Sequence, residues 1–340
     1  MASAEEPARP GGEAGSTAPA AIAAGPEAFR CLVCAAVACA AVLTKAAMHL
    51  ARCLQCGLVQ QHPLPAATVY DERYVRNGHG YGADMLRARP LFLRRDEAVL
   101  RGLLARGASG PLLDVGAGAG ILMEAARNVG LQPVGVELAQ GSVAYIREQL
   151  GLPVHAVPIE RAPFADASFG VVAFSHSLEH LLDPVGALQA ARRLLRPGGL
   201  VHIAVPHWAA AKRRAAGAAI AWIYDEHIAY FTRRTLRMVL IRAGFDVVAC
   251  HTLPMACDAD HRFAIALFER SRLDRPVRRF LRLGDRRLDT LLGDHVQVAC
   301  PPWRLRAVDR LARVLLRAWP ERLFGWLGLG EELRVTARRR

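Results

Sequence analysis

Lysine, cysteine and long apolar runs are all scarce in this chain, and the last two shortages each argue against a class of protein. Lys45 and Lys212 are the only lysines, so arginine carries nearly all of the positive charge behind the net charge of +13. The 8 cysteines, spread over 340 residues and clustered near the N-terminus, are too few for a disulfide framework. The apolar run at 31–44 has 14 residues, whereas a membrane-spanning helix needs ~20.

The N-terminal stretch also lacks the features of a signal peptide. Residues 1–29 consist mainly of Ala, Gly, Pro and Glu without a hydrophobic period, and their glutamates precede the first apolar run. This composition predicts a disordered tail. Together with the sparse cysteines, it leads us to expect a cytoplasmic protein.

From residue 111 to about residue 270, short apolar runs alternate with segments of helical period. This order predicts an α/β fold, with a parallel sheet covered by helices on both faces. The expected strands are 111–116, 133–137, 152–157, 169–175, 199–205, 245–253 and 262–270. The last two are separated by about eight residues and no helix, so we expect an antiparallel hairpin. The expected helices are 121–130, 139–151, 178–199, which stops at a Pro-Gly-Gly, and 232–244.

Composition shifts divide the rest of the chain around this domain. The expected units are the tail at 1–29, a cysteine-rich module at 30–70, linker helices at 71–110, the α/β domain at 111–270 and a helical extension at 271–340. The extension contains 17 arginines against 8 acidic residues, so it carries most of the excess charge.

The stretch LLDVGAGAGI at 112–121 has the pattern of a nucleotide-binding turn between a strand and a helix. Gly116, Gly118 and Gly120 would let the backbone approach a ligand closely. Glu137 ends the next expected strand, where its carboxylate could accept hydrogen bonds from both hydroxyls of a ribose. These features are common to enzymes that use NAD and enzymes that use S-adenosylmethionine.

Three features separate the two cofactors. The dinucleotide fingerprint requires a glycine at the position of Ile121. Asp114 would repel a pyrophosphate, but it can lie beside the ammonium and sulfonium of S-adenosylmethionine. A terminal hairpin is not expected of a dinucleotide domain. The turn therefore indicates S-adenosylmethionine.

Five motifs then follow one another in the order found in a known family. They are LLDVGAGAG, VGVE, FADASFGVVAFSHSLEHLLDP, LLRPGGLVHIAVP and HIAYFTRRTLRMVLIRAGF. Over residues 105–270 the chain resembles the class I S-adenosylmethionine-dependent methyltransferases. The resemblance implies a Rossmann-like sheet of seven strands with the last strand antiparallel. It also implies that the methionine side is lined by Asp114, Gly116, Gly118 and Gly120, and that Glu137 holds the ribose.

The adenine contact departs from the pattern of many relatives. They carry an aspartate after the third strand, where this chain has Pro158. The resemblance then leaves the backbone around Ile159 as the expected adenine contact.

Two Cys-x-x-Cys pairs, separated by 18 residues, are made by Cys31, Cys34, Cys53 and Cys56. This spacing is typical of a ribbon that holds zinc through four thiolates, and a site of that kind is structural because no coordination position stays open. The stretch RCLQCGLVQQHPLPAATVYDERY at 52–74, which contains the second pair, resembles the N-terminal zinc-binding module of some small-molecule and sugar methyltransferases. The alternative is an apolar helix with buried cysteines, since the run at 31–44 is unusually hydrophobic for a ribbon.

Methyl transfer to oxygen or carbon also requires a group that removes a proton. The candidate bases are His176, His180, His207 and His227. The segment WIYDEHIAYF at 222–231 is similar to the YHEH-x-x-YF segment of sugar C-methyltransferases, in which a Glu-His pair is the base. The similarity implies that His227 is the base and Glu226 its partner. His176, directly after the fourth expected strand, is the second catalytic candidate.

The segment 303–319 has an apolar face opposite an arginine face. Its helix would either dock on the catalytic domain or, with the rest of 303–330, lie on an anionic membrane. The membrane interpretation would suit a lipid-linked acceptor, such as a glycolipid.

The sequence thus predicts S-adenosylmethionine-dependent methyl transfer to oxygen or carbon of a small molecule, such as a sugar or another biosynthetic intermediate. Two alternatives stay open. An RNA methyltransferase would suit the zinc ribbon and the basic tail, although few aromatics are placed on a sheet for base stacking, so nucleic acid is disfavoured. A zinc-ribbon scaffold with a vestigial methyltransferase domain would have no activity.

Overall fold

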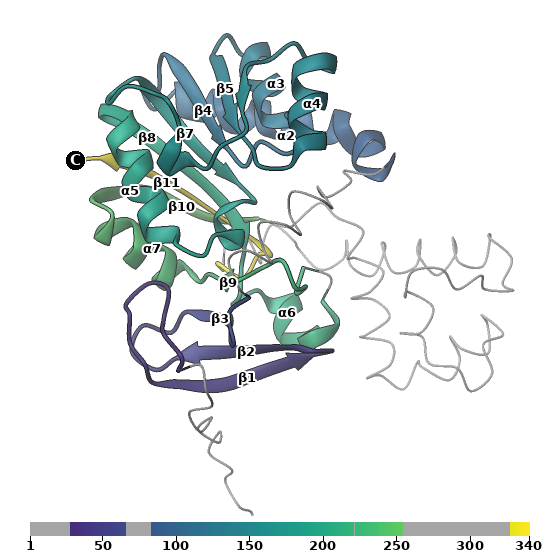
Figure 1. The fold of residues 1–340 in the computed structure, drawn as a ribbon, viewed down its shortest axis with the longest axis vertical. Helices are drawn as coiled ribbons and strands as arrows, with labels where there is room; N and C mark the ends of the chain where they lie inside the picture. Colours follow the sequence, from purple (N-terminus) through teal and green to yellow (C-terminus); the bar gives the residue numbers. More distant parts are fainter. Residues whose placement is uncertain (1–27, 66–82, 221, 254–326) are drawn as a thin grey trace, which may run out of the picture.

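The computed structural model describes residues 28–65, 83–220, 222–253 and 327–340. Its centre is a seven-stranded sheet of order β10-β11-β8-β7-β4-β5-β6 (Figure 1). The strands are β4 (Pro111–Val115), β5 (Gln132–Val136), β6 (Val154–His155), β7 (Phe169–Ser175), β8 (Leu195–Pro206), β10 (Phe245–Leu253) and β11 (Glu332–Arg339). Only β11 runs antiparallel to its neighbours in this described sheet, so the predicted seven-stranded methyltransferase fold is confirmed.

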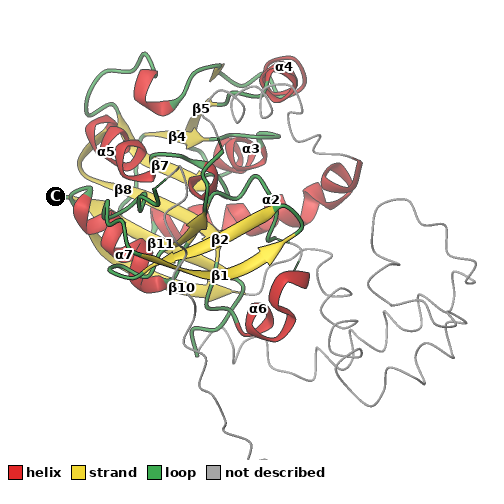
Figure 2. Ribbon diagram, turned by 60° about the horizontal axis from the view of Figure 1, so that its bottom comes forward, coloured by secondary structure: helices red, strands yellow, loops and turns green. Residues whose placement is uncertain are grey.

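Helices cover both faces of the sheet (Figure 2). They are α2 (Ala83–Leu104), α3 (Ile121–Asn128), α4 (Gln140–Gln149), α5 (Pro184–Leu194) and α7 (Arg233–Arg242). A short helix, α6 (Ala211–Ala216), follows β8 and lies outside these layers (Figure 1). Leu112 and Leu113 are neighbours on β4, yet Leu112 packs with α2 and α3, whereas Leu113 packs with α5 and α7. Successive strand residues point to opposite faces, so continuous apolar runs build two cores at once.

The predicted hairpin between 245–253 and 262–270 is wrong in its second strand. β10 pairs instead with β11, from Phe245 opposite Arg339 to Leu253 opposite Glu332, and β11 lies between β10 and β8. The central position of β11 follows from its alternating residues, because Leu333, Val335 and Ala337 are buried in the core. The end of the expected helical extension is therefore a strand of the sheet, while 262–270 lies outside the described residues.

The helix expected at 178–199 is also shorter than predicted. A 3₁₀ turn, η2 (Leu178–His180), comes first, and α5 begins only at Pro184, where Asp183 accepts a hydrogen bond of 2.8 Å from the Gly186 amide. The helix ends at Leu194, and the Pro-Gly-Gly lies within β8. Proline at the first helical position and an aspartate before it fix the start of α5.

The cysteine-rich module folds as a small antiparallel sheet of order β1-β2-β3-β9. Its strands are β1 (Cys39–Lys45), β2 (Met48–Cys53), β3 (Val59–Gln61) and β9 (Ala229–Tyr230). The alternative of an apolar cysteine helix is wrong, because residues 31–38 form a turn and irregular backbone and β1 occupies the rest of that run. Since β9 comes from the α/β domain, the module shares both a sheet and a hydrophobic core with that domain.

Some expected segments cannot be compared with the structure. The tail at 1–29 lies outside the described residues apart from its last two, of which Phe29 is buried against His62. The amphipathic helix expected at 303–319 also lies outside them. Within the described part of the chain, no helix has the length and hydrophobicity to cross a membrane.

Candidate active site

The glycine turn after β4 has the backbone that its sequence requires. Gly116, Gly118 and Gly120 have φ angles of 72°, 53° and 69°, a region that side-chain-bearing residues rarely adopt. A Cβ on Gly116 would lie 2.6 Å from Cβ of Ser177, and one on Gly120 would lie 2.7 Å from Cδ1 of Leu150. The conformation of the turn alone therefore favours glycine at these positions, whether or not a ligand is bound.

Glu137 joins this turn to the end of β5. Its Oε2 accepts a hydrogen bond of 2.7 Å from the Gly118 amide, and its Oε1 accepts one of 2.8 Å from the Ala139 amide. Each carboxylate oxygen keeps a second lone pair, which suits the two hydroxyls of a ribose. The buried position of Glu137 thus fits the role that the sequence predicted for it.

Asp114 lies at the base of the turn and is only 1% exposed. Its Oδ1 has no hydrogen-bond partner among the described residues. Burial, together with the charges of Asp96 and Glu137, raises the pKa of Asp114 to about 8. A buried carboxylate with an open acceptor fits a cationic ligand, so the residues present suit the methionine end of S-adenosylmethionine.

Ile159 opens a 3₁₀ turn, η1 (Ile159–Arg161), after β6. Its side chain is buried in the main core beside Val136. The side chain of Ile159 packs in the core, so an adenine could contact only the backbone here. This adenine contact stays a prediction.

A second polar cluster lies where β7 ends. His176 follows β7 with a φ of 55° and lies between two buried carboxylates. Its Nδ1 is 3.6 Å from Oε1 of Glu179, and its Nε2 is 3.3 Å from Oε1 of Glu332. Burial disfavours the charged ring, but the two carboxylates outweigh this effect and raise the pKa of His176 to about 9. His176 is therefore an imidazolium at neutral pH, which disfavours it as a proton acceptor.

His227 is buried next to this cluster. Its Nε2 is 3.8 Å from Oε1 of Glu179, and its ring centroid is 4.1 Å from that of Tyr224 and 4.7 Å from that of His180. The amide of Ile228 donates a hydrogen bond of 2.9 Å to the Glu179 carbonyl, which joins the His227 loop to η2. The structure therefore brings together His176, His180 and His227, three of the four candidate bases.

His207 has a different setting. Its Nδ1 donates a hydrogen bond of 2.9 Å to the Gly330 carbonyl, and the residue is 2% exposed. Burial lowers the pKa of His207, so it is a neutral ring fixed to the backbone.

Two functional candidates escaped the sequence analysis. Glu179 supplies the carboxylate beside Nε2 of His227, whereas Glu226 was the partner expected from the sequence, and that pairing stays a prediction. Glu332 comes from a strand 156 positions after His176, so no local pattern could have joined them. The Glu-His dipeptide at 179–180 was the available signal for Glu179.

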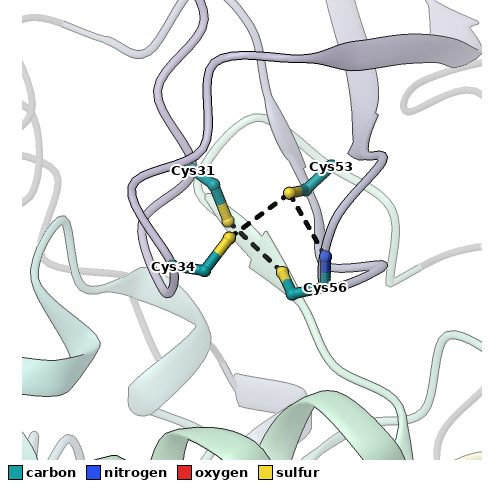
Figure 3. A group of neighbouring side chains, drawn as sticks. All are labelled: Cys31, Cys34, Cys53 and Cys56. Atoms are coloured by element: carbon teal, nitrogen blue, oxygen red, sulfur yellow. Dashed lines mark hydrogen bonds between the residues drawn. The ribbon is translucent and has the colours of Figure 1, made fainter.

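The four predicted metal ligands do meet in the structure. The sulfur atoms of Cys31 and Cys56 are 3.4 Å apart, and those of Cys34 and Cys53 are 3.5 Å apart. All four thiols lie within 4.8 Å of one another and point toward a common centre (Figure 3). The amide of Cys56 donates to Sγ of Cys53 over 3.5 Å, and amide donors of this kind stabilise thiolates. This arrangement fits a tetrahedral metal site, and Cys39 is not part of it.

One further set of donors has a suitable spacing. One ligand atom each from Glu179, His180 and His227 also lie within 4.8 Å of one another. The edge-on packing of the two imidazoles, with an interplanar angle of 80°, is equally an ordinary ring contact.

Comparisons with known proteins place these features in a family. Residues 85–250 match a family model described as a methyltransferase domain. The ubiquinone biosynthesis O-methyltransferase of Ruegeria pomeroyi is 37% identical over 94 residues, which cover 26% of this chain and 38% of the relative. The protein of the same name from Bordetella bronchiseptica is 38% identical over 96 residues, covering 26% of this chain and 40% of the relative. The matched region thus spans about two fifths of these curated relatives.

Among solved structures, an S-adenosylmethionine-dependent methyltransferase of Thermotoga maritima, described as a possible histamine N-methyltransferase, has a TM-score of 0.49 and 15% identity. The alignment covers 80% of this chain and 100% of the Thermotoga maritima protein. Residues 85–250 therefore form a methyltransferase domain, and the seven-stranded sheet with one antiparallel strand agrees with this match.

Proposed function

We propose that the chain transfers the methyl group of S-adenosylmethionine to an oxygen or carbon atom of a small molecule. The observation that carries this proposal is that two distinct polar sites lie at the carboxyl ends of the parallel strands. Asp114, the glycine turn and Glu137 lie at the ends of β4 and β5, and His227 with Glu179 lies beside the end of β7. Ser177 connects them, since its hydroxyl donates a hydrogen bond to the Val115 carbonyl. Parallel sheets place ligands at these ends of their strands.

The cofactor side provides charge and shape. When bound, S-adenosylmethionine supplies a methyl group attached to a positively charged sulfur, and the sulfur becomes a neutral thioether when the methyl group is transferred. Asp114 balances the positive charge at the methionine end, and Glu137 orients the ribose through its free lone pairs. The tight glycine turn brings the backbone close to the ligand.

The acceptor side provides a base. His227 accepts the proton of the acceptor as its oxygen or carbon forms the new bond to the methyl carbon. Glu179 lies beside Nε2 of this ring, which stabilises the imidazolium that results. His176 does not compete for the proton, because it is already charged at neutral pH. Tyr224 packs its ring against His227 and limits the ring orientations available to the base.

Two separate considerations support the class of acceptor. The curated relatives are named as O-methyltransferases of ubiquinone biosynthesis, which favours an oxygen atom of a small molecule. The resemblance of 222–231 to sugar C-methyltransferases favours a sugar, either free or lipid-linked. The base at His227 serves either acceptor, because both must lose a proton.

We also propose that Cys31, Cys34, Cys53 and Cys56 hold a structural zinc ion. The convergence of four thiols from two turns supports this assignment. A metal ion bound there would join the turn before β1 to the turn between β2 and β3. β3 in turn pairs with β9, which begins two residues after His227.

Radiolabelled transfer tests the proposed reaction. The full-length chain is incubated with S-[methyl-¹⁴C]adenosylmethionine and cell extract divided into small-molecule, lipid and RNA fractions. We expect the label in the small-molecule or the lipid fraction, which also decides between a free and a lipid-linked acceptor. Label confined to RNA, with binding that weakens steeply as salt rises, would establish the RNA alternative. Calorimetry that detects no binding of S-adenosylmethionine would leave the scaffold alternative.

A further inference from the structure

Glu332 enters the active site from the far end of the sequence. It is the first residue of β11, it pairs with Leu253 on one side and Pro206 on the other, and it is 1% exposed. Because β11 runs antiparallel to its neighbours, its first residue lies at the edge where the parallel strands end. The insertion of β11 thus delivers a buried carboxylate to the polar cluster that follows β7.

His176 connects this carboxylate to the acceptor side. Its amide is fixed by a hydrogen bond of 2.8 Å to the Ala204 carbonyl, and its backbone has a left-handed φ of 55°. Such a conformation is costly for a residue with a side chain and persists where the surroundings enforce it. The ring is thereby held with one nitrogen facing Glu332 and the other facing Glu179.

The charges nearest Glu332 set the state of this ring. Arg334, on β11, makes two hydrogen bonds of 3.0 and 3.1 Å to Glu332, and Arg95, on α2, lies 4.0 Å from it. Burial would raise the pKa of Glu332, but His176, Arg334 and Arg95 hold it well below its usual range. His202, on β8, stays neutral because burial and the charge of Arg334 lower its pKa to about 4. Glu332 is thus anionic and favours the imidazolium form of His176.

Glu179 needs that imidazolium. It is 1% exposed, and neither of its carboxylate oxygens has a hydrogen bond within the described part of the chain. Among the described residues, the histidine rings within ion-pair distance of it are those of His176, at 3.6 Å, and His227, at 3.8 Å. A buried carboxyl group without hydrogen bonds is stabilised by a positive charge beside it. His227 cannot provide one if it is to accept a proton, so this charge falls to His176.

We propose that Glu332 is a positioning residue for methyl transfer, because through His176 it holds the carboxylate of Glu179 beside the imidazole of His227. This inference rests on the proposed role of His227 as the base. It assigns a function to the last strand of the chain, which otherwise completes the sheet far from the glycine turn in sequence.

The test uses the full-length chain with Glu332→Gln, which keeps the shape of the side chain and removes its charge. Thr336→Val is the matched control, since Thr336 lies on the same strand and bonds to His202, outside the cluster. Histidine resonances are followed by NMR over pH in both variants and in wild type, and they are assigned with His176→Gln and His227→Gln. Binding of S-adenosylmethionine and ¹⁴C-methyl transfer into the fraction that wild type labels are measured alongside.

We expect Glu332→Gln to lower the titration midpoint of His176 from about 9 by about one pH unit or more. The ring resonances of His227 should move at constant pH, and kcat should fall roughly 10- to 100-fold with unchanged affinity for S-adenosylmethionine. Thr336→Val should leave both rings and kcat at wild-type values. An unchanged His176 midpoint, or unchanged His227 resonances and kcat, would overturn the inference. The NMR readouts do not depend on turnover, so a wild-type chain without transfer activity would contradict only the proposed function.

Discussion

Gln61 donates a hydrogen bond of 3.0 Å from its side-chain amide to the backbone carbonyl of His227. The same amide donates to the Asp225 carbonyl over 2.7 Å, and the Gln61 backbone amide donates to the Ile228 carbonyl over 2.9 Å. Lys45, on β1, adds a hydrogen bond of 3.1 Å to the Ile220 carbonyl. The cysteine module therefore holds the loop that carries the candidate base.

Replacing this glutamine should impair transfer more than cofactor binding. Gln61→Leu leaves the carbonyls of Asp225 and of the buried His227 without this donor, which costs roughly 1–3 kcal/mol of folding stability. We expect kcat to fall while the affinity for S-adenosylmethionine stays constant. Gln60→Leu is the matched control, because Gln60 contacts Arg30 and Leu32 in the cysteine turn rather than the His227 loop. Equal loss of kcat in both variants would argue against a specific role for Gln61.

Metal content should depend on the cysteine cluster. We expect about one zinc ion per chain by elemental analysis, its loss in Cys53→Ser and a lower melting temperature in that variant. Cys39→Ser is the control, since Cys39 also lies in the module but outside the cluster. Zinc retained in Cys53→Ser would contradict the assignment. A second equivalent that disappears in His180→Ala would instead identify Glu179, His180 and His227 as ligands.

Cofactor affinity should depend on pH through Asp114. The pKa of this buried carboxyl is about 8, so below that pH a proton must leave before the carboxylate can bind a cation. Affinity for S-adenosylmethionine should therefore rise by up to about tenfold per pH unit between pH ~6 and ~8. Calorimetry in buffers of different ionisation enthalpy should detect proton release. Asp114→Asn should bind weakly and without this pH dependence, and a pH-dependent affinity in that variant would exclude Asp114 as the group responsible.

The same raised pKa makes a prediction for the ligand-free chain. The pKa of Asp114 is higher in the folded chain, at about 8, than in the unfolded chain, at 3.8. The contribution of this residue to the free energy of unfolding therefore falls as the pH rises from 3.8 to about 8. Asp114→Asn should therefore be more stable than wild type above pH ~8 in the absence of cofactor. Thermal unfolding at several pH values measures this difference, and equal melting temperatures at high pH would show that Asp114 is not strained when ionised.

Much of the cofactor side could be predicted because its signals are local. Asp114 and the three glycines lie within seven residues, and the two cysteine pairs repeat one short spacing. Positive φ at a strand-to-helix turn leaves glycine as the favoured residue, so the pattern in the sequence and the geometry correspond directly.

The acceptor side was harder to predict because its partners are distant in sequence. The pairing of β10 with β11 joins residues 79 to 94 positions apart, and a nearer apolar run at 262–270 seemed sufficient for a hairpin. β9 has two residues, too few for any period, so the sheet shared with the cysteine module left no trace in the sequence. Glu179 was read as part of a helix start, although Pro184 delays α5 and leaves Glu179 in a buried 3₁₀ turn.

The central claim is tested most directly by comparing wild type with His227→Gln in cofactor binding and ¹⁴C-methyl transfer. His49→Gln, at an exposed histidine on β2, serves as the control. We expect equal affinity for S-adenosylmethionine in all three proteins, and a loss of transfer of roughly 100-fold or more in His227→Gln alone. Wild-type transfer by His227→Gln, or no binding of S-adenosylmethionine by the wild-type chain, would contradict the central claim.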